Sequence, residues 1–155
     1  MPQPNPPNPQ QQPAWVVSKK DCFWRAMRNA SGDPVFEQKF DGPAPSTWQE
    51  VYDTFKRYFA GKVPAATSPK HAQGEPEVMD YGQIVQELQA QEGAEGVVIV
   101  VYTNNESHAF NAANFKRNVV FIDDQKQFWP GNAPTQTVEA ALRGKVAYSM
   151  FYRTR

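Results

Sequence analysis

Apolar residues recur at helical spacing in the first part of the chain, most clearly at residues 48–59. Counted from Trp48, apolar side chains return after three, four, seven, ten and eleven positions, on one helix face: Trp48, Val51, Tyr52, Phe55, Tyr58 and Phe59. Thr47 with Glu50 three residues later is the sequence of a capping box, and Gly61 follows the last apolar residue. The pattern predicts a helix whose aromatic stripe belongs to the core.

A second helix is predicted earlier in the chain, at residues 22–29. Ser18 and Asp21 are its candidate caps, and the Ser-Gly-Asp-Pro sequence at 31–34 ends it. The apolar residues that follow, at 35–40, are expected to form a short strand.

A third helix is predicted at residues 80–92. It stops at Gly93 and turns three aliphatic residues inward: Ile84, Val85 and Leu88. The preceding segment, 62–79, is rich in Pro, Gly and Ala, and we expect it to be a loop.

After residue 93 the pattern changes from helical spacing to strands. The run Val-Val-Ile-Val-Val-Tyr at 97–102 predicts a buried central strand, and 108–114 and 118–125 predict two more strands joined by a turn. A short helix is expected at 138–143. The segment 145–153 predicts a last strand with four residues on one face: Val146, Tyr148, Met150 and Tyr152. Helices first and an antiparallel sheet afterwards predict an α+β fold.

The start of the chain has a different composition. Residues 2–13 hold six of the 14 prolines and no aliphatic or aromatic residue, so they cannot bury enough surface to fold. We therefore expect residues 1–14 to be a disordered Pro/Gln-rich linker and residues 15–155 to be one domain. Such a linker indicates the C-terminal module of a larger protein.

Charge and composition argue against several classes of function. Lys+Arg and Asp+Glu both number 16, which argues against nucleic acid or a membrane surface as a partner. One cysteine allows no internal disulfide, and with two histidines it makes a zinc site improbable, so we expect no metal and no cofactor. No apolar run reaches the roughly 20 residues of a membrane span, and no signal peptide is visible at the start.

The single cysteine, Cys22, lies at the predicted start of a helix. Backbone N–H groups and the helix dipole favour an anion there, so the position suits a nucleophilic thiolate. The alternative is that Cys22 is a small buried hydrophobic residue without chemistry.

His108 is the second candidate, because it opens a strand that pairs with one rich in carboxylates. If the turn between the strands has two or four residues, His108 shares a face with Asp123 and Gln125; a three-residue turn places Asp124 there instead. Either carboxylate could orient the imidazole and stabilise its cation. His71, in a polar segment, is expected to lie in an exposed loop.

The two strand sequences ESHAFN (106–111) and VVFIDDQ (119–125) resemble the paired motifs of the papain-fold toxin glutamine deamidases. In that family a His-Ala-x-Asn strand is followed by a Tyr/Phe-aliphatic-Asp-x-Gln strand. The resemblance implies a papain-like fold with N-terminal helices packed on an antiparallel β-sheet. It implies that Cys22 is the nucleophile, His108 the general base and acid, Asp123 the orienting carboxylate and Gln125 a supporting residue.

The family implies a bacterial toxin or effector that converts a glutamine side chain of a target protein to glutamate through a thioester. It also implies secretion or delivery into a target cell as part of a larger toxin, and a cognate immunity protein as partner. The sequence departs from the family pattern at Ser107, where glycine is common, and at Asp21, where asparagine is common. Val16 stands where papain has its oxyanion-hole glutamine.

Two other interpretations remain open. The same triad could serve a papain-like cysteine protease or a transglutaminase, since the thiol chemistry is shared. A non-catalytic binding module would instead hold Cys22 buried, unreactive and remote from His108.

Overall fold

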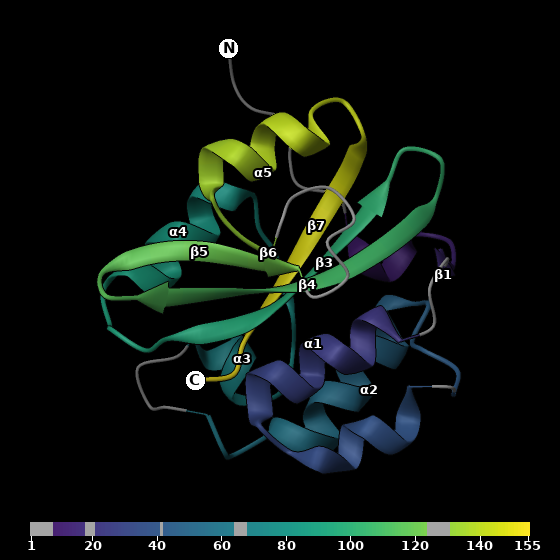
Figure 1. Ribbon diagram of the computed structural model, residues 1–155. Coiled ribbons are helices and arrows are strands. Elements are labelled where there is room, and N and C mark those ends of the chain that lie inside the picture. Colours follow the sequence, from purple (N-terminus) through teal and green to yellow (C-terminus); the bar gives the residue numbers. More distant parts are fainter. Residues whose placement is uncertain (1–7, 18–20, 41, 64–67, 124–130) are drawn as a thin grey trace.

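The computed structural model describes residues 8–17, 21–40, 42–63, 68–123 and 131–155. In this part of the chain, seven strands form one sheet in the order β2-β7-β3-β4-β5-β6, with β1 paired to β4 outside this path (Figure 1). The strands are β1 (Val16–Val17), β2 (Glu77–Val78), β3 (Glu95–Tyr102), β4 (Glu106–Phe115), β5 (Asn118–Asp123), β6 (Gly131–Pro134) and β7 (Val146–Arg153). Neighbouring strands are antiparallel except β1 and β4, which run parallel.

The central position of β3 explains its composition. It pairs with β4 on one side and β7 on the other, and helices cover both faces of the sheet, so an uninterrupted apolar run is buried there. The helices are α1 (Cys22–Ser31), α2 (Trp48–Phe59), α3 (Pro69–Ala72), α4 (Tyr81–Gln89) and α5 (Thr135–Leu142). The expected α+β class is confirmed.

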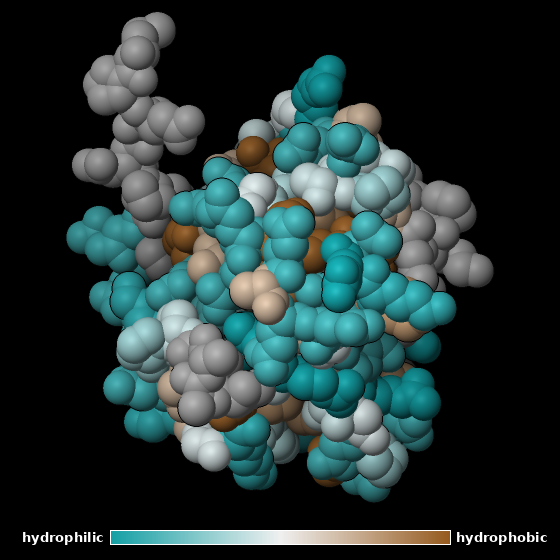
Figure 2. All heavy atoms as spheres, turned by 90° about the vertical axis from the view of Figure 1, so that its left-hand side faces the viewer, coloured by the Kyte–Doolittle hydropathy of each residue, from teal (hydrophilic) through white to brown (hydrophobic). Residues whose placement is uncertain are grey.

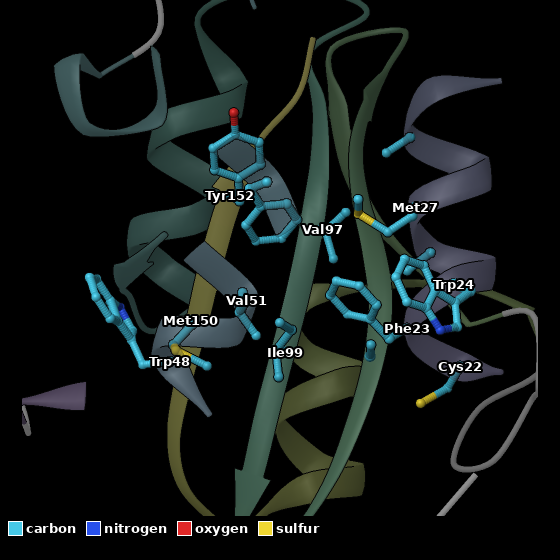
Figure 3. Close-up of a cluster of buried hydrophobic side chains, with 14 of the residues drawn as sticks. Cys22, Phe23, Trp24, Met27, Trp48, Val51, Val97, Ile99, Met150 and Tyr152 are labelled. Atoms are coloured by element: carbon cyan, nitrogen blue, oxygen red, sulfur yellow. The ribbon is translucent and has the colours of Figure 1, made fainter. Parts of the chain in front are cut away.

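Each face of the sheet has its own core. On one face, α1 and α2 pack their aromatic residues against Val97, Ile99 and Met150 (Figure 3). On the other face, α4 and α5 pack against Val98 and Val100 of β3 and against buried residues of β4, β5 and β7. The alternation of side chains along β3 therefore divides the molecule into two apolar layers.

The three predicted helices of the first part of the chain are present. Thr47 caps α2 by accepting a hydrogen bond from the Glu50 N–H (3.1 Å), while the Glu50 carboxylate accepts from the N–H of Ser46 (2.8 Å). Asp80 forms a reciprocal capping box with Gln83 at the start of α4. The last helix extends from Thr135 to Leu142.

Two expectations for the connecting segments were wrong. Residues 35–40 do not form a strand: the 3-10 helix η2 (Pro34–Lys39) occupies this position, because Asp33 accepts a hydrogen bond from the Val35 N–H (3.0 Å) and Pro34 favours a first helical turn. The expected loop at 62–79 contains α3 and β2. Within it, His71 is fully buried rather than exposed, since α3 packs against β7.

The face of Val146 was also predicted wrongly. Tyr148, Met150 and Tyr152 face α1 and α2 as expected, but Val146 packs in the other layer. The pairing of β7 with β3 shifts by one residue between Val101 and Tyr102. Such a bulge turns the following side chain to the opposite face.

The part of the surface formed by described residues carries few large apolar side chains. Among the described residues, Val16 and Phe115 are the exposed large hydrophobic ones. The side seen in Figure 2 is mainly hydrophilic, with apolar residues in small separate patches. No helix in the described ranges is both long and apolar enough to span a membrane. Of the expected linker, residues 8–14 are described and include the 3-10 helix η1 (Pro9–Gln11).

Candidate active site

The candidate site lies where two strands separate along one edge of β4. This edge pairs with β1 at residues 106–107 and with β5 at residues 111–115, and His108 lies between these two pairings. The chain continues from β1 to Cys22 at the start of α1, and β5 ends at Asp123. His108 therefore lies between the segment that leads to Cys22 and the end of the strand that carries Asp123.

The turn between β4 and β5 fixes which acidic residue faces His108. It contains two residues, Lys116 and Arg117, both with positive φ (51° and 71°), and Phe115 pairs with Asn118. This is the geometry of a type I′ hairpin. The resulting register puts Asp123 on the same face as His108, as the sequence predicted for a two-residue turn.

His108 and Asp123 form a buried pair. The His108 Nε2 atom lies 3.0 Å from Asp123 Oδ2, and the side chains are 2% and 1% exposed. Burial acts to lower the pKa of His108, but hydrogen bonds with Asp123 and Cys22 and the charges of both groups outweigh it and raise the pKa to about 9. At neutral pH the imidazole is therefore protonated.

Cys22 is the first residue of α1 and only 4% exposed. Its side chain projects from the start of the helix (Figure 3) and lies close enough to His108 for the hydrogen bond that contributes to the histidine pKa. Because Nε2 of His108 is paired with Asp123, Nδ1 is the ring nitrogen left to exchange a proton with the sulfur. The two residues share a narrow pocket whose other walls are mainly apolar: Trp15, Val17, Phe23, Ala44, Pro45, Ile99, Ser107 and Ala109.

The acidic residue before the cysteine is paired with an arginine. Asp21 occupies the N-cap position of α1 without a capping hydrogen bond from its side chain. Its carboxylate instead lies 2.6 Å from Nε of Arg25, which also stacks over the ring of Phe40 at 4.7 Å. Arg25 thereby places a positive charge beside the carboxylate that precedes Cys22.

One hydrogen-bond donor for a substrate oxyanion can be assigned, the N–H of Cys22. The first intrahelical bond of α1 runs from the Arg25 N–H to the Asp21 carbonyl, so the N–H of Cys22 precedes the helical ladder and can point to a substrate oxygen. Val16 has no side-chain donor, and its N–H is bonded to the carbonyl of Asn105 (2.8 Å). It cannot replace the glutamine of papain.

The structure brings Cys22, His108 and Asp123 together and keeps His71 apart. His71 lies against β7, which β3 separates from β4, and its Nδ1 atom accepts a hydrogen bond from the Arg153 N–H (3.3 Å). Gln125 and the alternative Asp124 lie outside the described residues, and the role of Gln125 stays a prediction. Within the described ranges, no cluster of three His, Cys, Asp or Glu side chains could hold a metal ion.

One buried polar residue near the site, the asparagine of the His-Ala-x-Asn motif, had no role predicted from the sequence. Asn111 is 1% exposed and lies in β4, three residues after His108. Its signal was a polar residue inside a strand that is otherwise apolar around it, but the partners of its side chain come from distant segments.

The family model described as papain fold toxin 1, glutamine deamidase, matches residues 13–127. The chain belongs to this family of papain-fold toxins. The matched range includes Cys22, His108, Asp123 and Gln125. No curated protein sequence matches the chain.

A solved structure is also similar to this papain-fold toxin. The crystal structure of the Pseudomonas avirulence protein AvrPphB matches with a TM-score of 0.40 and 14% sequence identity, covering 87% of this chain and 88% of that one.

Proposed function

We propose that this papain-fold toxin deamidates a glutamine side chain of a target protein, with Cys22 as nucleophile. The observation that carries the proposal is the buried arrangement of Cys22 and His108 around one pocket at a helix start, with Asp123 3.0 Å from the imidazole. A thiolate beside an imidazolium is the reactive state of cysteine acyl-transfer enzymes.

The reaction follows from this arrangement. The Cys22 thiolate attacks the carboxamide carbon, and the N–H of Cys22 stabilises the oxygen that becomes negative. As the C–N bond breaks, His108 gives its proton to the nitrogen, which leaves as ammonia. The neutral imidazole then takes a proton from water, whose oxygen attacks the thioester carbon, and the products are glutamate and the regenerated Cys22–His108 pair.

The pocket favours a side-chain carboxamide over a peptide bond. Cys22 and His108 are almost completely buried, and the pocket above them is narrow with mainly apolar walls. A glutamine side chain approaches such a pocket from one end only, whereas a peptide bond requires space for chain on both sides. We therefore propose deamidation, rather than proteolysis, as the reaction.

Replacement of the nucleophile is the first test. Cys22→Ala should abolish conversion of glutamine to glutamate in target-cell proteins and leave the circular dichroism spectrum unchanged, because the substitution removes only one buried sulfur atom. Mass spectrometry of a lysate treated with each protein measures the conversion. Activity retained by Cys22→Ala would contradict the proposal.

Intact-mass analysis of a modified substrate separates the related reactions. Deamidation leaves a single chain with a very small mass gain, proteolysis gives two fragments, and transglutamination gives an adduct with an amine. A binding module would leave the substrate mass unchanged, with Cys22 no more reactive than in a His108→Ala variant.

We further propose that the domain acts in a target cell as the C-terminal module of a larger secreted toxin, and that an immunity protein inhibits it in the producing cell. Membership in a toxin family and the Pro/Gln-rich start of the chain support this proposal. Copurification of the domain with the product of a neighbouring gene would test the immunity partner.

A further inference from the structure

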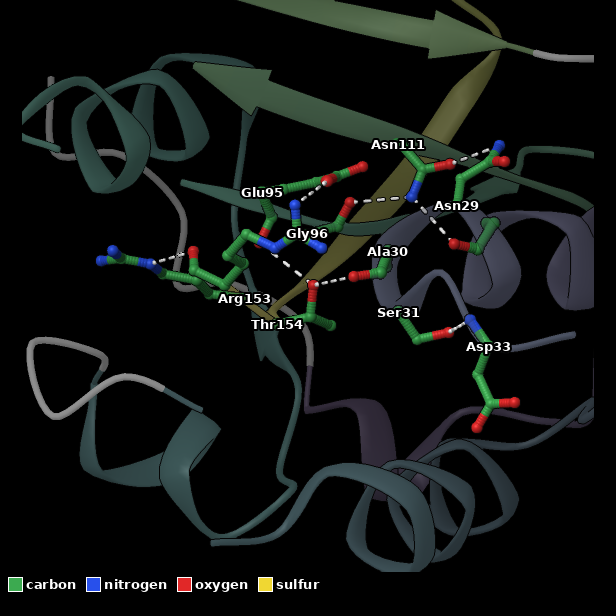
Figure 4. A network of polar contacts seen from close by, with 11 residues as sticks. Asn29, Ala30, Ser31, Asp33, Glu95, Gly96, Asn111, Arg153 and Thr154 are labelled. Atoms are coloured by element: carbon green, nitrogen blue, oxygen red, sulfur yellow. Dashed lines mark hydrogen bonds and ion pairs between the residues drawn. The ribbon is translucent and has the colours of Figure 1, made fainter. Parts of the chain in front are cut away.

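We infer that Asn111 is a positioning residue that sets the distance between Cys22 and His108. This inference rests on the proposed function, because it concerns the geometry of the same cysteine–histidine pair. Its basis is a hydrogen-bond network between β4 and α1, the two elements that carry these residues (Figure 4).

The carboxamide of Asn111 joins three elements of the fold. Its Nδ2 atom donates to the carbonyl of Ala26 in α1 (2.9 Å) and to the carbonyl of Gly96 in β3 (3.2 Å). Its Oδ1 atom accepts from Nδ2 of Asn29, also in α1 (3.3 Å). Because the side chain is 1% exposed, water cannot replace these partners at low cost.

The network lies close to the reacting groups along both elements. Ala26 follows Cys22 by about one turn of α1, and Asn111 follows His108 by three residues of β4. Ala26 and Ala30, both buried, present only methyl groups to the sheet, so the helix approaches closely enough for Asn111 to reach a main-chain carbonyl. A shift of α1 along the sheet would therefore move the Cys22 sulfur relative to the imidazole.

A carboxamide is the group that this position requires. Both Nδ2 hydrogens have carbonyl acceptors, and the oxygen faces a donor. An aspartate would place a carboxylate against two carbonyl oxygens, and an apolar residue would leave those carbonyls without this donor. These paired donors and acceptors fix the position of α1 along the sheet and its rotation about its own axis.

A second contact between the sheet region and α1 provides a matched control. The Thr154 hydroxyl, just after β7, lies 3.5 Å from the carbonyl of Ala30 and 3.3 Å from that of Glu95. Ala30 is two turns from Cys22, so loss of this contact should weaken the packing of α1 without moving its first turn. Thr154→Val removes the hydroxyl at constant shape.

The experiment measures alkylation of Cys22 by iodoacetamide in the wild type, Asn111→Ala, Thr154→Val and His108→Ala. At about pH 6, an ordinary thiol is almost entirely protonated and reacts slowly, so fast alkylation reports the pair with His108. We expect Asn111→Ala to lose at least about tenfold in rate, towards the His108→Ala value, because a displacement near 1 Å is enough to disrupt such a pair. Thr154→Val should stay within about twofold of the wild type while losing some thermal stability.

The outcomes separate the two proposals. If the wild type reacts no faster than His108→Ala, the proposed function fails, and the inference about Asn111 fails with it. If His108→Ala is slow but Asn111→Ala reacts like the wild type, the inference alone is overturned. If Asn111→Ala does not fold, Asn111→Ser, which keeps one donor, takes its place and should give an intermediate rate; a wild-type rate would overturn the inference.

Discussion

His108 is the residue whose properties depend most on its neighbours. Burial alone would make it a neutral imidazole, yet Asp123 on one side and Cys22 on the other raise its pKa to about 9. Asp21, which precedes Cys22 in the chain, is paired with Arg25. At this scale, the chemistry follows from the pair of His108 and Asp123, which is held out of water.

The role of Asp123 can be tested through the pH dependence of catalysis. Loss of the proton from His108 should cause the alkaline decline of kcat/KM, near pH 9 in the wild type. Asp123→Asn removes a charge that raises the pKa of His108, so the decline should move to lower pH and the maximal rate should fall by about 10²- to 10⁴-fold. Asp33→Asn, at the cap of η2, is a control that should leave the profile unchanged. An unshifted alkaline decline in Asp123→Asn would contradict this role.

The hairpin of β4 and β5 is the element that places Asp123. Its turn forces Lys116 and Arg117 into the left-handed region, where residues with a Cβ atom are disfavoured. The hairpin keeps this turn because β4 and β5 are each paired on their outer sides, with β3 and β6. Strand pairing therefore outweighs the local preference of two residues.

A turn sequence suited to this geometry should stabilise the protein. Lys116→Asn with Arg117→Gly creates the Asn-Gly pair preferred in type I′ turns, and we expect the free energy of unfolding to rise by about 1 kcal/mol. Lys116→Val places a β-branched residue at φ 51° and should lower the free energy of unfolding. Urea denaturation measures both effects, and equal stability of the two variants would show that the turn is not strained. Alkylation of Cys22 should not change in the Asn-Gly variant.

At the scale of the whole molecule, the two histidines have opposite effects on the pH dependence of stability. His71 lies within 4 Å of the carboxylates of Glu77 and Glu87. Burial nevertheless lowers its pKa from 6.5 to about 4, against a hydrogen bond with the backbone of Phe151 that acts to raise it, and the charges of Arg153 and Lys70 lower it further. In contrast, the pKa of His108, in β4, is raised from 6.5 to about 9.

These shifts predict that stability contributed by the histidines is greatest near pH 6.5. Above this pH, the unfolded chain releases the proton of His108 while the folded protein keeps it up to about pH 9, so stability falls as pH rises. Below pH 6.5, His71 binds a proton in the unfolded chain, whereas in the folded protein it stays neutral down to about pH 4. Stability therefore falls as pH decreases. Each slope can reach about 1.4 kcal/mol per pH unit.

Denaturant unfolding between pH 4 and pH 9 measures both limbs. His71→Phe should flatten the acid limb alone, and His108→Gln should flatten the alkaline limb alone. An acid limb of unchanged slope in His71→Phe would assign it to other groups.

The sequence determined the parts of this protein that depend on short stretches of chain. The spacing of apolar residues and the caps Thr47 and Asp80 place α2 and α4, and the β-branched run places β3, because helix and strand periods are set within a few residues. Alternation along the strand limited the partner of His108 to Asp123 or Asp124. The motif around His108 indicated the family, because its residues are adjacent in the chain.

Only the tertiary structure decided burial, register and the contacts between distant segments. A two-residue turn, kept by pairing on both sides, selected Asp123; a shift in pairing with β3 turned Val146 to the other layer; and packing of α3 on β7 buried His71. The three partners of Asn111 lie 85, 82 and 15 residues away in the chain. The physical reason is the same in each case: the sequence sets which face a residue can take, whereas the packing of remote elements sets what that face meets.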